Sequence, residues 1–196
     1  MQKIVPETAI LIPEDAQCVF QGEIYGVYQW KQVLYDGSQA KFEMLKRPDT
    51  ATAICLVDNS VLVLNEEQPH RGRRMCVPGG RVDPEDADML SAAQREVLEE
   101  TGYSFEKWRL IRVTQPINKI EWFVYVWLAW EPTGRQEATH DAGEKIHMKQ
   151  LSLRELKQLI HEQRRTIDEA FELFDEIDSL DELLEFSEYT GKIVDR

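Results

Sequence analysis

The sequence predicts an α/β fold in which a mixed β-sheet lies between helices and a small β-rich segment precedes it. The first observation is that strand-like and helix-like stretches mix without the regular βαβ repeat of a doubly wound sheet. The second is the run from Glu121 to Trp130, in which both alternating sets of residues are apolar, as in a central strand covered on both faces. The third is a set of residues at helical spacing that gives one helix a buried stripe: Leu90, Ala93, Val97 and Thr101.

Residues 1–48 form the predicted β-rich segment. Its β-favouring runs are short and interrupted by glycines, and they cover residues 18–20, 24–25, 27–35 and 41–46. Asp36-Gly37-Ser38 is a hairpin-type turn between the last two runs. Arg47-Pro48-Asp49 ends the segment.

A second hairpin is predicted from residues 51–57 and 61–64, which flank Asp58-Asn59-Ser60. Residues 66–74 are polar, and we predict a loop there. Basic residues outnumber acidic ones in this loop, although the chain as a whole is acidic. Residues 75–78 then lead into a turn at Gly79 and Gly80.

The helix that follows this turn carries the strongest chemical signal. Asp86 or Asp88 can cap its start, and Gly102 stands where a glycine stop belongs. Glu96, Glu99 and Glu100 are spaced so that all three share one helical face. Arg95 can pair with Glu99, which leaves two carboxylates of the kind that hard divalent cations bind. The alternative is an ordinary solvated acidic face.

Beyond this helix the predicted elements are a strand at 110–114, the strand at 121–130, a loop at 132–142 and a strand at 145–150. The aromatic residues of the strand at 121–130 pack a core or, alternatively, form a stacking surface for bases. Ser152 and Glu155 form a capping box for a helix over 153–163. A second helix is expected over 168–174. Residues 175–186 are acidic and amphipathic, and continue that helix or form a separate docking helix. The predicted domains are residues 1–48, 49–175 and 176–196.

Composition excludes several classes of function. The formal net charge of −13 over 196 residues argues against nonspecific binding of nucleic acid or anionic membranes. No long apolar run and no secretory leader are present, so we expect a cytoplasmic protein without a membrane anchor. The odd number of cysteines, Cys18, Cys55 and Cys76, predicts free thiols in a reducing compartment.

The stretch from Gly80 to Tyr103 resembles the signature of the Nudix family. Residues Arg95-Glu96-Val97-Leu98-Glu99-Glu100-Thr101-Gly102-Tyr103 fit the second half of that signature in full. In the first half, five residues follow Gly80, and Asp86 then stands where the signature has a glutamate. Eight residues instead of seven separate Asp86 from Arg95. Glu85, Asp86 and Asp88 are therefore all candidates for the first acid. The resemblance implies an α/β/α sandwich, with residues 49–175 as the hydrolase domain.

Outer motifs are similar to those of ADP-ribose (ADP-sugar) pyrophosphatases. They include Tyr28-Gln29-Trp30, Phe42-Glu43-Met44-Leu45-Lys46-Arg47, the basic loop that ends at Arg74, and Ile167-Asp168-Glu169-Ala170. This resemblance implies a homodimer formed through residues 1–48 and a substrate-binding role for Tyr28, Trp30, Arg47 and Arg74. Tyr28 and Trp30 could instead pack the dimer core. The marker glycine after Pro116 is replaced by Ile117, in a loop that helps to choose the substrate.

The family's chemistry implies a role for each acidic residue. Glu96, Glu99, Glu100 and the Gly80 carbonyl would bind Mg²⁺ or Mn²⁺, with Glu99 alternatively orienting its neighbours. Arg95 would hold the carboxylates in place. Glu144 would activate the attacking water, with Asp141 as the alternative. The expected reaction converts ADP-ribose or another ADP-sugar to AMP and a sugar phosphate. The alternatives are another diphosphate substrate, such as GDP-mannose or NADH, and a nucleotide-sensing module without catalysis.

Overall fold

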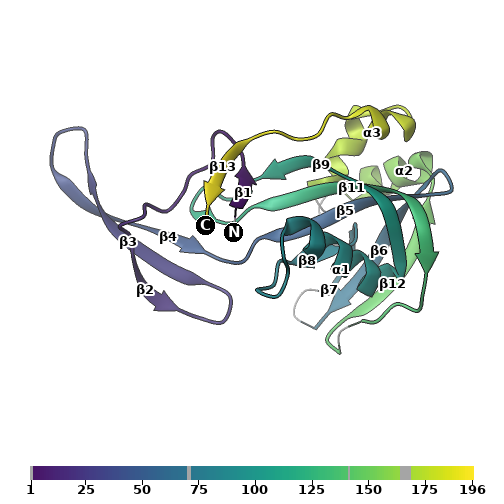
Figure 1. Cartoon of the computed structure of the whole chain (residues 1–196), viewed down its shortest axis with the longest axis horizontal. Helices are drawn as coiled ribbons and strands as arrows, with labels where there is room; N and C mark the ends of the chain where they lie inside the picture. The colour runs from purple at the N-terminus through teal and green to yellow at the C-terminus, as the bar shows by residue number, and fades with distance from the viewer. Residues whose placement is uncertain (1, 70–71, 141, 164–168) are drawn as a thin grey trace. The chain divides into compact units, whose positions relative to one another are not determined.

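The computed structural model describes residues 2–69, 72–140, 142–163 and 169–196 (Figure 1). Asp141, the alternative base, lies outside these ranges. So do residues 167 and 168, with which the predicted motif at 167–170 and the predicted helix over 168–174 begin. The chain divides into two compact units. The first comprises residues 1–50, 113–124 and 190–196, and the second comprises residues 51–112 and 125–189. The three predicted domains stay a prediction, as does the role of residues 1–48 in dimerisation.

The first unit contains, within the described residues, two small sheets. In one, β1 (Gln2–Val5) pairs antiparallel with β13 (Lys192–Asp195), so that the two ends of the chain meet in one ladder. In the other, the order is β10-β4-β3-β2, formed by β2 (Gln17–Gln21), β3 (Gly26–Val33), β4 (Gln39–Lys46) and β10 (Ile120–Glu121). Neither β1 nor β13 was expected from the sequence.

The predicted hairpin at Asp36-Gly37-Ser38 is confirmed. Strands β3 and β4 pair antiparallel on either side of it, from Gly26↔Lys46 to Val33↔Gln39. The Asp36 carboxylate accepts hydrogen bonds from the backbone N–H and the hydroxyl of Ser38 at 2.9 and 2.6 Å. Gly37 has φ of 83°, a conformation that favours glycine.

The second unit is built on a sheet of seven strands within the described residues, with the path β12-β6-β5-β11-β9. Strand β7 pairs with β6, and β8 pairs with β5. The strands are β5 (Thr50–Val57), β6 (Ser60–Gln68), β7 (Gly72–Cys76), β8 (Gly79–Arg81), β9 (Tyr103–Thr114), β11 (Val124–Arg135) and β12 (Lys145–Leu151).

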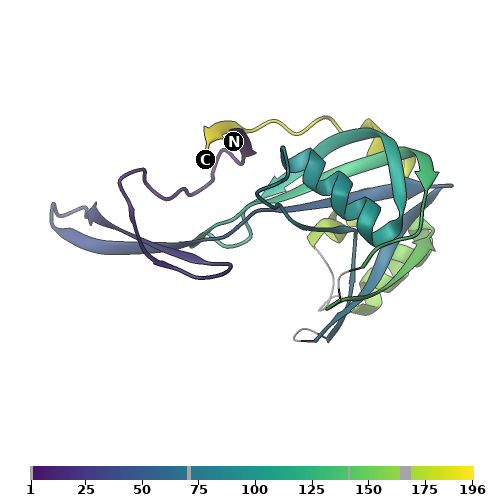
Figure 2. The same cartoon turned by 60° about the horizontal axis from the view of Figure 1, so that its bottom comes forward.

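Helices lie on the two faces of this sheet, as Figures 1 and 2 show. Helix α1 (Met89–Thr101) covers one face, where Val97 packs with Ala53, Leu62 and Ala129. Helix α2 (Leu153–Gln163), the 3-10 helix η1 (Glu169–Glu176) and helix α3 (Asp181–Glu185) lie on the other side (Figure 2). The expected α/β architecture is therefore confirmed.

Local capping signals are also confirmed. The Asp88 side chain caps α1 by accepting from the Ser91 N–H at 2.7 Å, and Gly102 ends the helix with φ of 74°. The Ser152 hydroxyl and the Glu155 carboxylate form the expected capping box of α2. Along α1, Val97 and Thr101 are buried as expected, whereas Leu90 is only half-buried and Met89 takes its place in the core.

Several predicted elements need correction. Residues 66–68 and 72–74, predicted as parts of a loop, lie in strands, because β6 runs to Gln68 and β7 starts at Gly72. Their charges pair across the two strands, Glu66 with Arg74 and Glu67 with Arg73, which makes a polar sequence compatible with a ladder. The strand predicted at 121–130 divides into β10 and a β11 that continues to Arg135. The second C-terminal helix is a 3-10 helix, and the acidic stretch after it forms a separate short helix, α3.

Candidate functional site

The glycine turn presses directly against the carboxylates of α1. The Gly79 N–H donates to Oε2 of Glu100 at 2.7 Å. A Cβ atom at Gly80 would lie 2.5 Å from Oε1 of Glu96, so a side chain at this position would displace that carboxylate. The glycines therefore allow the backbone and the carboxylates to approach closely.

Arg95 holds the acidic loop and the helix together. Its guanidinium makes a two-pronged pair with Asp86, at 3.0 Å from Nε and 2.9 Å from the second nitrogen. It also contacts Glu96 at 2.8 Å and, as the spacing predicted, Glu99 at 3.1 Å. Of the three candidates for the first acid, Asp86 faces Arg95, Asp88 caps the helix, and Glu85 is exposed.

Burial makes two of the helix carboxylates unusually hard to ionise. Desolvation raises the pKa of Glu96 to about 7, against an opposing contribution from Arg95. Desolvation also raises the pKa of Glu100 well above its ordinary value, although the Gly79 N–H opposes it. The negative charges of Glu66 and Glu144 raise the pKa of Glu100 further, so these acids act on one another through space. Such a cluster favours a bound cation.

Further side chains of this cluster come from β6, from β7 and from Glu144, just before β12. Glu66 is buried, and its Oε2 pairs with Arg74 at 2.6 Å. The Gln68 amide donates to Glu66 and to Oε1 of Glu144, the second at 3.0 Å. The structure thus brings Glu144 close to the metal-ligand candidates, and it places Arg74 in an ion pair within the cluster.

Sequence reasoning missed Glu66 and Gln68. Their contribution depends on β6 continuing through the polar stretch, because residues two apart in a strand share one face. The one available signal was the alternation of Glu66 and Gln68 with Glu67, opposite the arginines of β7.

The donor chemistry fits a hard divalent cation, since carboxylate and backbone carbonyl oxygens are its preferred ligands. Among the residues that the structure describes, however, no three or more His, Cys, Asp or Glu side chains are already arranged to hold a metal ion. Glu96 is turned to Arg95, and Glu100 to the Gly79 N–H. A cation would have to compete with these two donors.

The other predicted substrate-binding residues belong to the first unit. The Arg47 guanidinium lies over the Trp122 ring at 4.6 Å and near the Tyr25 ring at 5.8 Å. Trp30 packs against Phe42, its partner across the β3–β4 pair, with ring centroids 6.2 Å apart. Tyr28 lies across from Cys18 of β2. The structure thus brings Arg47 together with Trp122 and Tyr25, which the sequence did not indicate.

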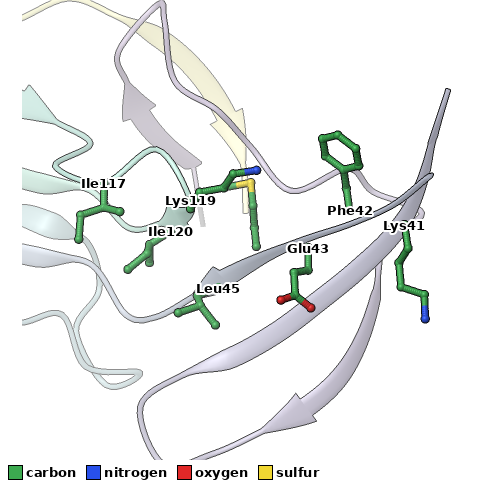
Figure 3. A pocket seen from close by; sticks show the side chains of 8 residues that line it. Lys41, Phe42, Glu43, Leu45, Ile117, Lys119 and Ile120 are labelled. Carbon is green, nitrogen blue, oxygen red and sulfur yellow. The ribbon is translucent and has the colours of Figure 1, made fainter. Parts of the chain in front are cut away.

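A pocket of about 610 Å³ lies within the first unit (Figure 3). Its wall consists of residues 41–45 of β4 together with Ile117, Lys119 and Ile120. The Lys119 ammonium stands over the Phe42 ring at 5.3 Å. The loop in which Ile117 replaces the family's marker glycine therefore lines this pocket.

No helix in the described part of the chain is both long and apolar enough to cross a membrane. No curated protein matches the chain significantly.

Solved structures share the fold at low sequence identity. An "ADP compounds hydrolase" has 16% identity and a TM-score of 0.66, with 83% of this chain and 91% of that chain covered. A MutT NUDIX hydrolase from Burkholderia pseudomallei has 20% identity and a TM-score of 0.52, with 67% and 98% covered. A NUDIX hydrolase from Nitrosomonas europaea has 19% identity and a TM-score of 0.55, with 72% and 91% covered.

The family model described as NUDIX domain matches residues 46–171, which is well over half of the chain and includes the glycine turn, α1 and Glu144. With the fold, the turn and the carboxylate helix in agreement, the chain belongs to the Nudix family.

Proposed function

We propose that this enzyme hydrolyses the phosphoric anhydride bond of ADP-ribose or a related ADP-sugar and releases AMP and a sugar phosphate. As a Nudix hydrolase it acts on phosphoric anhydrides of nucleoside diphosphate derivatives. The observation that carries the proposal is the contact of two carboxylates with the glycine turn, that of buried Glu100 and that of half-buried Glu96. The ADP-sugar preference rests on the outer motifs of the sequence, and the fold shared with an ADP compounds hydrolase is consistent with it.

Glu96, Glu99, Glu100 and the Gly80 carbonyl are the proposed ligands of Mg²⁺ or Mn²⁺. Such an ion, when bound, neutralises charge on the phosphate oxygens and orients the diphosphate. Arg95 is proposed to act on the carboxylates and not on the substrate, because its donors are engaged with Asp86, Glu96 and Glu99. This assignment gives Arg95 a positioning role.

Glu144 is proposed to accept the proton of the attacking water. Its electrostatic effect on both Glu96 and Glu100 supports a place beside the ligand carboxylates. A base must lie within hydrogen-bonding reach of the water that attacks the diphosphate. Glu144 directly precedes β12 in the chain.

A homodimer is proposed through residues 1–48. The support in the structure is the exposure of several large apolar side chains of this segment, which a partner would cover. They include Val19, Phe20, Ile24, Val33 and Tyr35. Tyr28, Trp30, Arg47 and Arg74 stay candidates for contact with the substrate.

A panel of diphosphates tests the activity. Purified protein would be incubated with Mg²⁺ or Mn²⁺ and with ADP-ribose, another ADP-sugar, GDP-mannose or NADH. Alkaline phosphatase then releases inorganic phosphate from the products and not from the intact diphosphates. We expect the highest kcat/KM for ADP-ribose or the ADP-sugar, and loss of activity in Glu96→Gln prepared in parallel. A preference for GDP-mannose or NADH would overturn the substrate assignment, and no hydrolysis of any compound would overturn the proposed function.

A further inference from the structure

The geometry points to Gln68 as a positioning residue that fixes the side chain of Glu144 through a hydrogen-bonded chain from Arg74. This inference rests on the proposed function, in which Glu144 is the base. In this series of hydrogen bonds, Arg74 donates to Glu66, and the Gln68 amide donates to both Glu66 and Glu144.

Strand register places these residues on one face. Glu66 stands opposite Arg74 of β7 and opposite Ile146 of β12. The β6–β12 ladder ends at Lys145↔Glu67, and Gln68 and Glu144 are the next residues outward on the two chains. Their side chains are in hydrogen-bond contact at 3.0 Å. Directly opposed residues in an antiparallel pair project to the same side of the sheet, which brings the two side chains together.

The carboxylate of Glu66 is held in place, and it anchors the series of hydrogen bonds. Its side chain is only 4% exposed, and its two oxygens serve different donors. Oε2 accepts from Arg74 at 2.6 Å and lies 3.5 Å from the Cys76 thiol, while Oε1 accepts from Gln68. A buried carboxylate held by a charge-assisted bond is a rigid acceptor. Gln68 is thereby held by a group that cannot move freely.

The chemistry of the amide suits the space between two carboxylates. A glutamine side chain has two N–H donors on one nitrogen, and here Nε2 donates to both Glu66 and Glu144. The opposite orientation would point the amide oxygen at the carboxylate oxygens, which are also acceptors. The two carboxylates therefore require that the amide nitrogen faces them. The bridge restrains Glu144 without adding charge to a site that is meant for a cation and an anionic substrate.

The first arm of the test detects the bridge itself. In the ¹⁵N–¹H spectrum of the full chain, the side-chain amide protons of Gln68 should be shifted downfield and exchange slowly. In Glu144→Ala, the chemical shift of one of the two protons should move toward the value of a free amide. The shift of the other proton, which is bound to Glu66, should stay unchanged. Two freely exchanging protons in the wild type would overturn the inference.

The second arm is kinetic and uses Gln68→Met, which keeps the shape of the side chain and removes the donors. We expect kcat to fall about 10- to 100-fold, as is usual for groups that orient a reacting residue, with KM nearly unchanged. In the Glu144→Gln background, Gln68→Met should cause no further loss, because Gln68 acts through Glu144. The matched control is Gln158→Met, which removes an exposed amide–carboxylate pair of the same 3.0 Å length in α2.

Independent, multiplying losses in the double variant would overturn the inference, and so would an unchanged kcat in Gln68→Met. In both cases the wild-type enzyme still hydrolyses its substrate, so the proposed function stands. If the wild type hydrolysed none of the diphosphates in the panel, the proposed function would be overturned. The role of Glu144 as a base, on which the inference about Gln68 rests, would then be overturned as well.

Discussion

Asp86 and Arg95 form a two-pronged ion pair, with one carboxylate oxygen 3.0 Å from Nε and the other 2.9 Å from the neighbouring guanidinium nitrogen. Asp86 also accepts from the Asp83 N–H at 2.8 Å, which closes the acidic loop on itself. The extra residue of this loop therefore does not remove its tie to α1. Of the three candidates for the first acid, Asp86 is the one that pairs with Arg95, and we propose it for that position.

Breaking this pair should destabilise the fold. Asp86 is only 6% exposed and Arg95 is 29% exposed, so removal of the carboxylate leaves a partly buried charge without its main partner. We expect Asp86→Asn to lower the free energy of unfolding by about 1.5–3 kcal/mol, the range for hydrogen bonds to charged groups. Denaturant titration of the wild type and the variant measures this difference in unfolding free energy. The control is Glu85→Gln on the exposed side of the loop, and an equal loss in both variants would contradict the role of the pair.

The same pair predicts a pH dependence. The hydrogen bond from Arg95 is the main cause that holds the pKa of Asp86 below its ordinary value. Because the folded-state pKa is the lower one, the stabilisation is fully present above the unfolded value, about 3.9, and is lost as the pH falls through the folded pKa. The difference in unfolding free energy between wild type and Asp86→Asn should be constant from about pH 5 to 7 and shrink below about pH 4. A difference that grows in acid would contradict it.

Local signals in the sequence were enough for the caps and turns. The Gly102 stop and the Ser152–Glu155 capping box each involve residues within a few positions of one another, so their geometry follows from spacing. For the start of α1 the spacing left Asp86 and Asp88 as alternatives, and the structure shows Asp88 as the cap. The shared face of Glu96, Glu99 and Glu100 follows in the same way from one helix.

Features that depend on distant pairing could not be predicted. Strands β1 and β13 form only because the two ends of the chain meet, as in the pair Ile4↔Ile193. Strand β7 is polar, and its charges are stable in a ladder because Glu66 and Glu67 lie opposite arginines. The contact between Gln68 and Glu144 needs the register of β6 and β12, which no local pattern contains.

Metal binding should stabilise the folded protein. A ligand that binds only the folded state stabilises it by mass action, by about 1.4 kcal/mol at ten times its Kd. We expect millimolar Mg²⁺ to raise Tm in the wild type, because it relieves repulsion among Glu96, Glu99 and Glu100. The rise should be smaller in Glu100→Gln and unchanged in the control Glu188→Gln, which lies on the exposed surface. An equal rise of Tm in all three proteins would mean that Mg²⁺ binds at a site that does not include Glu100.

The proposed dimer predicts that a charge on the exposed edge of β2 separates the subunits. Phe20 is 61% exposed on this edge strand, where a partner would cover it. We expect Phe20→Glu to change the mass in light scattering from that of a dimer to that of a monomer. Leu184→Glu is the control, because Leu184 is 37% exposed and lies in α3, outside the predicted seam. A monomeric wild type would contradict the dimer.

The last prediction separates metal binding from base catalysis. Glu100 is assigned to the metal because it lies one turn from Glu96 and touches the glycine turn. Glu100→Gln should therefore weaken Mg²⁺ binding and activity together, and a high Mg²⁺ concentration should restore part of the activity. The amide oxygen still accepts from the Gly79 N–H, so the loss should reflect charge and not a disrupted turn.

Glu144→Gln should behave differently, because the missing function is proton acceptance and not charge neutralisation. We expect kcat to fall by about 10²–10⁴, the usual contribution of a general base, while the Mg²⁺ concentration for half-maximal activity changes little. Raising Mg²⁺ should not restore the rate. If Glu144→Gln kept full turnover and Asp141→Asn were inactive, the base would be Asp141, which lies outside the described residues. If both variants stayed active, Glu99 would be the next candidate, because its half-exposed carboxylate lies on the same helical face and has Arg95 beside it.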